Sequence, residues 1–274
     1  MPYKRILTIQ DISCIGQCSV TVALPVLSVC GHETCILPAA VLSTHTGGFG
    51  KPEIIHLKDS MPQIIDHWRR QGITFDVIYT GYLGSIQAID CAASIMDTML
   101  APGGIIIVDP AMADHGKLYS GFDDAYAAAI KRLCERADIM LPNITEAAMM
   151  TGLPYHENFD VAYIRELLSR LGGKHIVLTG VGFQQNQTGA AIRSDGKISF
   201  YHHKRFDKSY HGTGDLFAAC LTGAIASGKD LYRAVQIASE FTCKCIENTF
   251  AAPAHWYGVK FETALPYLLD LLKE

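Results

Sequence analysis

Short apolar segments alternate along this chain with longer segments in which apolar residues recur at helical spacing. The clearest apolar segment is Ile105-Ile-Ile-Val108, a continuous β-branched run that predicts a strand buried on both faces. Further strands are predicted at residues 4–10, 34–38, 76–81, 138–141 and 175–179. This alternation predicts an α/β protein with helices on both faces of a mostly parallel sheet.

Helices are predicted between these strands and after the last of them. They span residues 17–31, 60–71, 86–99, 123–136, a segment beginning near 145, 159–171, 214–227, 231–248 and 261–272. Residues 188–193 and 197–203 flank Ser-Asp-Gly and are expected to pair as a hairpin. Because no linker, repeat or low-complexity tract interrupts this order, we predict a single domain over residues 1–274.

Composition excludes several classes of protein. Of the 274 residues, 49% are hydrophobic and 18% are charged, which suits a globular protein with a buried core. The net charge of −4 argues against a nucleic-acid binder, which needs a basic surface. We find no signal peptide and no apolar run of about 18 residues, so we expect a cytoplasmic protein that does not bind membranes. The nine cysteines form no paired metal-binding pattern and are expected to be thiols.

Polar residues stand at the ends of several predicted strands. Tyr82, Asp109, Asn143 and Thr179 each end or follow one. In an open parallel sheet, ligands bind beyond the carboxyl ends of the strands. We therefore predict that these residues share one site.

A glycine-rich turn precedes the helix predicted at 214–227. Gly212, Thr213 and Gly214 are followed by Asp215 and a run of small apolar residues. Glycine allows a tight turn and close approach of a ligand, and the free N–H groups of a helix N-terminus favour an anion such as phosphate. Asp215 has two interpretations: a helix N-cap, or a general base that takes a proton from a hydroxyl group attacking phosphorus.

The remaining candidates also have a structural and a functional interpretation. Asp109 and Asp114 share a loop and either stabilise turns or face Mg²⁺ and its waters. Asn143 and Glu146 lie on one face of a helix start, where they either form a cap or bring Glu146 to a metal-bound water near phosphate. In the polar loop 43–50, His45 is most simply a loop histidine. Thr46, like Thr44 and Tyr82, hydrogen-bonds either a polar aromatic ligand or the local backbone.

These segments resemble a known family. Gly212-Thr-Gly-Asp215 followed by Leu-Phe-Ala-Ala resembles the C-terminal signature of the ribokinase-like superfamily. The narrower resemblance, to pyridoxal/pyridoxamine kinases, covers nearly the whole chain. It rests on Thr8-Ile-Gln10, Ser43-Thr-His-Thr46, Thr80-Gly-Tyr82, the run from Asp109 to Tyr119, and Leu141-Pro-Asn-Ile-Thr-Glu146.

The resemblance implies a ribokinase-like three-layer α/β/α fold and transfer of the ATP γ-phosphoryl group to the 5′-hydroxymethyl group of pyridoxal, pyridoxamine or pyridoxine. Asp215 is then the base, and residues 212–214 form the anion hole. The implied nucleotide and metal residues are Asp109, Asp114, Tyr119, Asn143, Glu146, Thr179, Thr213 and Gly214. Of these, Asp109, Asp114 and Glu146 organise Mg²⁺. The resemblance also implies a monovalent cation such as K⁺ near Thr179. Thr46 and Tyr82 hold the pyridine ring, with His45 beside them, and the protein is a homodimer.

The chain departs from the family pattern at several positions. Asp11-Ile12 stands where many relatives carry Ser-His, so either Asp11 accepts a hydrogen bond from the ring or Ser13 substitutes. Leu141 replaces a threonine of some relatives, which affects nucleotide or cation contacts. The segment 38–60 is too short for the β lid of sugar kinases. We therefore expect no separate lid domain and a substrate cover made of loops 43–50 and 110–121.

Two other functions compete with a vitamin B6 kinase. A hydroxymethylpyrimidine kinase of thiamine metabolism would also phosphorylate a flat heteroaromatic hydroxymethyl compound. A non-catalytic vitamin-binding protein is a further alternative, although the intact Gly-Thr-Gly-Asp argues against it.

Overall fold

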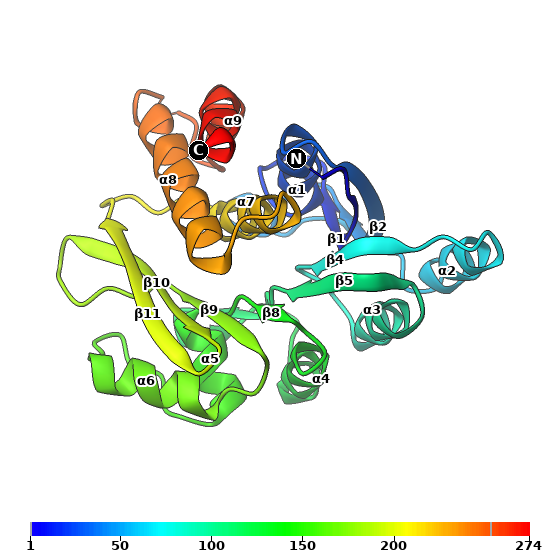
Figure 1. Ribbon diagram of the computed structural model, residues 1–274, viewed down its shortest axis with the longest axis horizontal. Coiled ribbons are helices and arrows are strands. Elements are labelled where there is room, and N and C mark those ends of the chain that lie inside the picture. The colour runs from blue at the N-terminus through cyan, green and yellow to red at the C-terminus, as the bar shows by residue number, and fades with distance from the viewer. Residues whose placement is uncertain (1, 253) are drawn as a thin grey trace.

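The computed structural model describes residues 2–252 and 254–274 of the chain (Figure 1). In these residues, nine strands form one sheet in the order β11-β10-β9-β8-β5-β4-β1-β2-β3. The strands from β9 to β2 in this order are parallel, and antiparallel strands flank them at both edges. Their bounds are β1 (Arg5–Ser13), β2 (Glu33–Leu42), β3 (Ile54–His56), β4 (Phe75–Thr80), β5 (Leu100–Val108), β8 (Ile139–Met140), β9 (His175–Thr179), β10 (Gln187–Ser194) and β11 (Lys197–Lys204).

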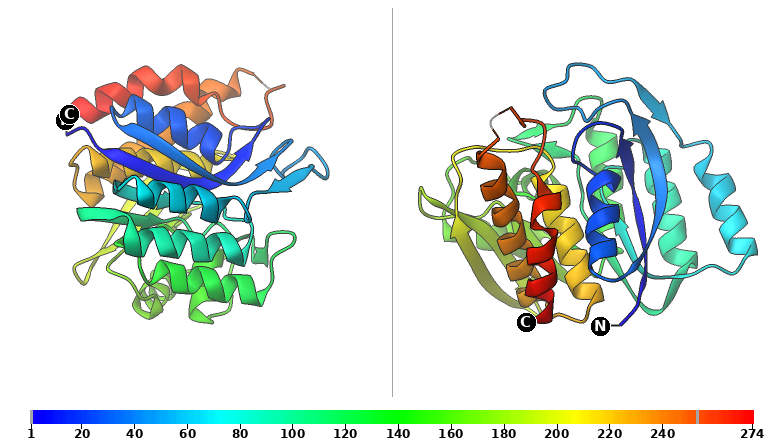
Figure 2. Two further views of the ribbon diagram at one scale, coloured as in Figure 1. Left: turned by 90° about the vertical axis from the view of Figure 1, so that its right-hand side faces the viewer. Right: turned by 90° about the horizontal axis from the view of Figure 1, so that it is seen from above.

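Helices cover both faces of this sheet (Figures 1 and 2). One face carries α2 (Met61–Arg70), α3 (Ile86–Thr98), α4 (Asp124–Cys134), α5 (Ile144–Thr151) and α6 (Val161–Arg170). The other carries α1 (Val20–Val29), α7 (Thr213–Ala226), α8 (Leu231–Phe250), the 3-10 helix η1 (Phe261–Ala264) and α9 (Leu265–Lys273). The predicted three-layer α/β/α architecture is confirmed.

The central strands show why an unbroken apolar run marks this fold. In β5, Ile106 and Val108 enter the core on one face of the sheet, while Ile107 enters the core on the other. Successive side chains of a strand point to opposite faces, so a strand covered on both sides must be apolar throughout. The predicted hairpin is also present: Asp195 and Gly196 both have positive φ, at 49° and 74°, which matches the tight turns that join antiparallel strands.

The sequence prediction is wrong around residues 11–13. The first strand was predicted to end at residue 10, but Asp11 and Ser13 also belong to β1, which pairs with β2 as far as Ser13 and Leu42. Both side chains are buried, and the Ser13 hydroxyl donates to Asp11 Oδ2 at 2.9 Å. The strand continues because the two polar groups satisfy each other inside it.

Three elements were not predicted at all. β3 adds a short antiparallel strand at the edge of the sheet. β6 (Ala113–Asp114) and β7 (Lys117–Leu118) form a small separate hairpin inside the loop that follows β5. In addition, β5 begins before the predicted apolar run 105–108, because residues 100–104 form an irregular first part of the strand.

In the described part of the chain, no helix is both long enough and apolar enough to cross a lipid bilayer.

Candidate active site

The carboxyl ends of neighbouring parallel strands bring several predicted site residues together. The Asp109 N–H donates to the Thr80 carbonyl oxygen at 3.0 Å, and the Thr179 N–H donates to the Pro142 carbonyl oxygen at 2.9 Å. Asn143 and Thr179 form a further parallel bridge beyond β8 and β9. Asp109, Asn143 and Thr179 therefore lie at one edge of the sheet, as their positions after strands predicted.

The glycine turn begins α7 in a conformation that only glycine adopts readily. Gly212 is the N-cap residue with φ of 77°, and its carbonyl accepts the Leu216 N–H at 2.9 Å. A side chain at Gly212 would collide with the Gln17 carbonyl oxygen and contact the Cys18 sulfur. The Thr213 hydroxyl donates to the Tyr210 carbonyl oxygen at 3.1 Å and fixes the turn. The first N–H groups of α7 are thus presented where an anion could bind.

Asp215 lies in the first turn of α7, directly after these N–H groups. Burial raises the pKa of its carboxyl group to about 7, with a further contribution from the negative charge of Asp11, while the backbone amide of Ser19 acts in the opposite direction. A carboxyl group with a pKa near neutrality is suited to accept a proton and release it again.

Asp109 and Glu146 are two further acids of the same cluster. Burial raises the pKa of Asp109, and the charges of Glu146 and Asp215 raise it further. Burial also raises the pKa of Glu146, to about 7, against the opposing effect of three backbone N–H donors. Like charges held this close in a poorly solvated site are costly unless a cation or a proton compensates them.

Asn143 and Glu146 form a complete capping box at the start of α5. Asn143 Oδ1 accepts the Glu146 N–H at 2.9 Å, and Glu146 Oε2 accepts the Asn143 N–H at 2.8 Å. Glu146 Oε1 accepts N–H groups of Met112 at 3.1 Å and Ala113 at 3.4 Å. The structural interpretation of this pair is therefore correct, and Glu146 also anchors the loop that carries the β6–β7 hairpin.

This hairpin places Asp114 and Tyr119 at the rim of the cluster. Asp114 is exposed, accepts the His115 N–H at 2.8 Å and lies 3.6 Å from the His115 ring. The Gly116 N–H donates to the Thr145 hydroxyl at 3.0 Å, which ties the hairpin to α5. The phenol of Tyr119 has a raised pKa because of burial and the charges of Glu146 and Asp109. Tyr119 therefore borders the acids, and Asp114 is exposed at their rim, where its charge also contributes to the raised pKa of Tyr119 and of Glu146.

The expected ring-binding residues divide into two groups. Tyr82 stacks on Phe122 with ring centroids 5.3 Å apart, and Phe122 stacks on Tyr126 at 3.7 Å. Burial, and to a lesser extent the charge of Asp11, raise the pKa of the Tyr82 phenol. Thr46 is exposed in its loop. Tyr82 thus presents a flat aromatic surface backed by Phe122, while Thr46 lies on the open side.

His45 has a clear structural role. Its Nε2 lies 3.0 Å from the Tyr257 carbonyl oxygen, and its Nδ1 accepts the Gly47 N–H at 3.0 Å. A carbonyl oxygen only accepts, so Nε2 carries the proton and both ring nitrogens are used. Phe49 extends the same contact, with its ring 4.7 Å from Trp256. His45 thus joins the loop 43–50 to the segment 254–258.

The residues present fit a magnesium ion only in part. Among residues 2–252 and 254–274, no three His, Cys, Asp or Glu side chains are grouped so as to hold a metal ion directly. The oxygens of Glu146 are occupied by backbone donors, and Asp114 faces outward. Asp109 is the acid best placed to meet a cation. Mg²⁺ commonly uses one or two carboxylates and takes its other ligands from water and phosphate, and this arrangement suits such binding.

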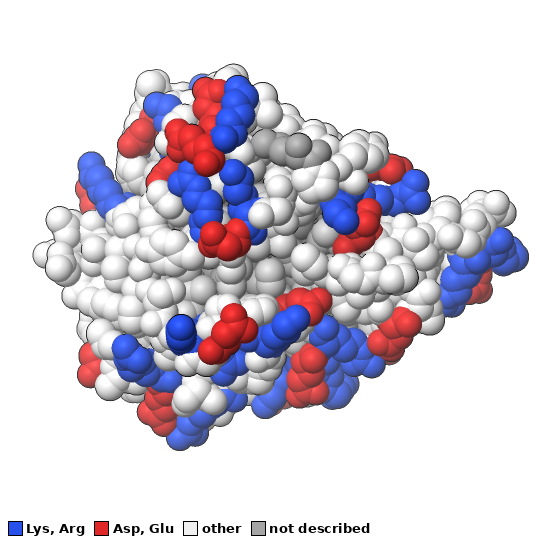
Figure 3. All heavy atoms as spheres, viewed as in Figure 1, with Lys and Arg blue, Asp and Glu red and all other residues white. Residues whose placement is uncertain are grey.

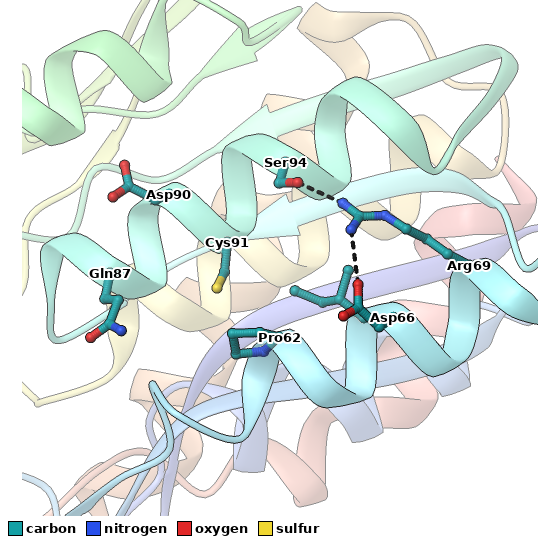
Figure 4. A pocket seen from close by; sticks show the side chains of 8 residues that line it. Pro62, Asp66, Arg69, Gln87, Asp90, Cys91 and Ser94 are labelled. Atoms are coloured by element: carbon teal, nitrogen blue, oxygen red, sulfur yellow. Dashed lines mark hydrogen bonds and ion pairs between the residues drawn. The ribbon is translucent and has the colours of Figure 1, made fainter.

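A groove between α2 and α3 is separate from these residues (Figure 4). Its volume is about 220 Å³, and it contains none of the predicted site residues. Arg69, which lines it, donates to Asp66 at 3.2 Å and to Ser94 at 2.6 Å. Because this guanidinium group is already paired, the groove offers no free cation for a phosphate.

On the face in Figure 3, Lys and Arg are interspersed with Asp and Glu, without one broad field of either sign.

Several residues that border the site were not predicted from the sequence. They are Phe122 behind Tyr82, Trp256 and Tyr257 against the loop 43–50, and Ser19 beside the carboxylates. An aromatic residue in an otherwise polar, glycine-containing segment is the signal that marks Phe122. Ser19 carries no such signal, because serine before a helix is ordinarily a cap.

The three-layer fold is that of the ribokinase-like class of small-molecule kinases. The chain belongs to the phosphomethylpyrimidine kinase family, whose model matches residues 58–259. It is 33% identical to a pyridoxal kinase from Lactobacillus plantarum, with a TM-score of 0.91 and 98% of each chain covered. A putative phosphomethylpyrimidine kinase from Bacteroides thetaiotaomicron, crystallised with pyridoxal, is 30% identical with a TM-score of 0.89, covering 97% of this chain and 96% of that one.

The chain is also similar to the hydroxymethylpyrimidine/phosphomethylpyrimidine kinase of Haemophilus influenzae. The two are 29% identical over 173 residues, which is 61% of this chain and 64% of that enzyme. The match thus spans less than two thirds of this relative. The proteins similar to this chain therefore include both pyridoxal kinases and pyrimidine kinases.

Proposed function

We propose that this protein transfers the γ-phosphoryl group of ATP to the 5′-hydroxymethyl group of a vitamin B6 compound: pyridoxal, pyridoxamine or pyridoxine. The observation that carries the proposal is the position of Asp215, in the first turn of α7 directly after the Gly212–Gly214 turn and within electrostatic reach of Asp11. In this proposal the base, the anion site and the partner for a polar aromatic ring belong to one site. The likeness to the Lactobacillus plantarum pyridoxal kinase supports it.

Each residue then has a defined task. The substrate ring lies by Tyr82, and Asp11 accepts a hydrogen bond from its 3-hydroxyl group or protonated nitrogen. Asp215 takes the proton of the 5′-hydroxyl group as that oxygen attacks phosphorus. The N–H groups of residues 212–214 bind the negative charge on the transferred group. Phosphoryl transfer depends mainly on such positioning and charge stabilisation.

The nucleotide side of the site is formed by Asp109, Asn143, Glu146 and Thr179. Asp109 would hold the magnesium ion of Mg·ATP, and Glu146 would keep the loop that follows Asp109 in place. When bound, the ion neutralises phosphate charge and orients the phosphate chain. Tyr119 borders the triphosphate, and a monovalent cation such as K⁺ near Thr179 belongs to the same proposal.

Hydroxymethylpyrimidine is the second candidate substrate. The family match and the Haemophilus influenzae relative favour it. The two substrates differ in their ring substituents, and the pyrimidine lacks the 3-hydroxyl group that Asp11 would bind. The likeness to the Lactobacillus plantarum pyridoxal kinase, which covers 98% of each chain, is our reason for ranking the B6 compounds first.

The test is a coupled assay of ADP release with Mg²⁺, run in parallel on pyridoxal, pyridoxamine, pyridoxine and hydroxymethylpyrimidine. We expect strong turnover of at least one B6 compound. Turnover of the pyrimidine alone would replace the proposal with a role in thiamine metabolism. Binding of pyridoxal without turnover of any of the four compounds would favour a non-catalytic vitamin-binding protein.

A further inference from the structure

We propose that His45 is a positioning residue that fastens the loop 43–50 to the segment 254–258, and that it does so only as a neutral imidazole with its proton on Nε2. The family resemblance assigns the next residue, Thr46, to the substrate ring, so the effect on catalysis rests on the proposed function. The effect on the loop itself follows from contacts within the chain and holds for any substrate of the site.

The hydrogen bonds of His45 reach three separate parts of the chain. Its backbone N–H donates to the Ile15 carbonyl oxygen at 3.0 Å. Its Nε2 donates to the Tyr257 carbonyl oxygen at 3.0 Å, and its Nδ1 accepts the Gly47 N–H at 3.0 Å. One side chain thus ties its own loop to a carbonyl group 212 positions further along the chain.

The ring of His45 is enclosed by its neighbours. His45 is only 4% exposed. The rings of Phe49 and His211 lie against it, each with 5.0 Å between ring centroids. A ring packed this closely keeps one orientation, so the hydrogen-bond partner of each nitrogen is fixed.

Close packing of the same loop on two other segments supports this contact. A side chain at Gly47 would collide with the His211 ring, and a side chain at Gly48 would collide with the Trp256 ring. Glycine at both positions lets the loop approach these rings closely. Because His211 directly precedes the glycine turn 212–214, the loop is held against the start of the candidate anion site.

Only the neutral form of His45 can make its two ring hydrogen bonds. A carbonyl oxygen only accepts, so Nε2 must carry a proton for the bond to Tyr257. Nδ1 must carry none, because the Gly47 N–H occupies its lone pair. A second proton on the ring would place two N–H groups against each other and break the bond to Gly47.

The surroundings of His45 also oppose its charged form. Residues 15–17 and 43–50 contain no Asp, Glu, Lys or Arg. The titratable side chains on the other two segments in contact with it are His211, His255 and Tyr257. Across residues 2–252 and 254–274, no carboxylate forms an ion pair with His45. Burial lowers the pKa of His45 against the effect of the Tyr257 carbonyl group, and the charge of His211 lowers this pKa further.

The fastening of the loop should therefore depend on pH. The folded-state pKa of His45 lies below the ordinary value of 6.5, so the unfolded chain takes up this proton first as the pH falls. The contribution of His45 to stability is fully present above pH 6.5 and is lost as the pH falls from there through the lowered pKa. The loop 43–50 should loosen over the same range.

Nuclear magnetic resonance of the wild-type protein tests this without any substrate. Long-range ¹H–¹⁵N spectra, with His45 assigned by the signals lost in His45→Gln, should show the ring proton on Nε2 at neutral pH. As the pH is lowered, the Gly47 amide should titrate together with the His45 ring, with a midpoint below 6.5. A proton on Nδ1 at neutral pH, or a Gly47 amide that does not respond when His45 titrates, would overturn the proposal.

Kinetics of His45→Gln test the effect on the site. Glutamine carries an N–H donor for the Tyr257 carbonyl oxygen but leaves the Gly47 N–H without the imidazole acceptor. We expect the KM for the vitamin to rise about tenfold, the upper range for one lost hydrogen bond, with kcat and the KM for ATP within about twofold of wild type. His67→Gln on the exposed side of α2 is the matched control and should leave all three constants unchanged. A wild-type KM for the vitamin, or equal rises in both KM values, would contradict the assigned role.

A second variant separates the fastening of the loop from direct contact with the substrate. Trp256→Ala removes a partner of the loop on the segment 254–258 and leaves His45 in place. If both residues act by fastening one loop, their effects on the KM for the vitamin should be clearly non-additive in the double variant. Additive effects would show that His45 acts by another route and would overturn the proposal. If wild type turns over none of the four compounds, the proposed function fails, while the joint titration of His45 and Gly47 still decides this inference.

Discussion

Asp215 has a pKa raised to about 7 by burial, which makes the charge of this single residue sensitive to pH in the neutral range. The base must be ionised to accept a proton, so kcat/KM should fall as the pH drops below about 7.

Asp215→Asn should retain vitamin and ATP binding while kcat falls by at least about a hundredfold. Steady-state kinetics and equilibrium titration measure the two effects. Unchanged turnover would exclude Asp215 as the base.

The same residue should reduce the stability of the protein. Its folded-state pKa lies above the ordinary value of 3.8, so the folded state binds more protons than the unfolded chain between these values. Stability is therefore lost as the pH rises through this window, and the full penalty applies above pH 7. Asp215→Asn should raise the free energy of unfolding by about 1–3 kcal/mol at pH 8 and by little at pH 4. Denaturant titration at both pH values measures this, and an equal gain at both would contradict it.

Asp11 should affect Asp215 through its charge. The negative charge of Asp11 raises the pKa of Asp215, so Asp11→Asn should move the acid limb of the kcat/KM profile to lower pH. The KM for the vitamin should rise in the same variant, because the ring loses a charged partner. Asp90→Asn, an exposed acid on α3, is the control and should leave the limb in place. A shift of the limb to higher pH would contradict the assigned coupling.

These residues also show what the sequence can and cannot reveal. The strand ends predicted that Asp109, Asn143 and Thr179 would lie together, because parallel strands end at a common edge. The direction in which Asp114 points depends on a hairpin of only a few residues that no periodicity marks. The contact of His45 with Tyr257 joins residues far apart in the chain. No local sequence pattern marks a contact between residues this far apart.

At the scale of elements, the capping box of α5 connects helix stability to the site. Asn143→Ala should lower the free energy of unfolding by about 1 kcal/mol, as for other N-caps. Because Asn143 also donates to the Ala113 carbonyl oxygen at 2.8 Å, the variant should loosen the loop beside Asp109 and raise the KM for ATP.

The N-cap of α6 supplies a matched control for this prediction. Asp160 accepts the Tyr163 N–H at 2.8 Å and lies on an exposed helix end that carries none of the predicted site residues. Asp160→Ala should cost a similar amount of stability without changing the KM for ATP. Chemical denaturation and initial-rate kinetics on both variants test this. Equal KM values for the two would mean that the capping box has no part in nucleotide binding.

Long apolar elements were predictable, and short ones were not. The buried strands and amphipathic helices each contribute several side chains to a core, which leaves a clear pattern in the sequence. In contrast, β3 has three exposed residues, and β6 and β7 have two residues each. Elements of this size are determined by contacts with the rest of the structure, so their residues carry no period of their own.

At the scale of the whole molecule, the nine-stranded sheet leaves one apolar edge uncovered in the described chain. β3 pairs with β2 on one side only, and Ile55 in β3 is 63% exposed. An exposed apolar edge strand can pair with a second chain. The predicted homodimer would cover this edge, and Ile54 beside Ile55 would enlarge the apolar contact.

Substitution at this edge tests the prediction. Ile55→Lys should convert a dimer to a monomer, because a buried, unpaired lysine at an interface costs several kcal/mol. Light scattering coupled to gel filtration measures the mass directly. Val161→Lys, an exposed apolar residue at the start of α6, is the control and should leave the mass unchanged. If wild type is dimeric and Ile55→Lys stays so, the two chains meet through another surface, and β3 is only an edge of the sheet.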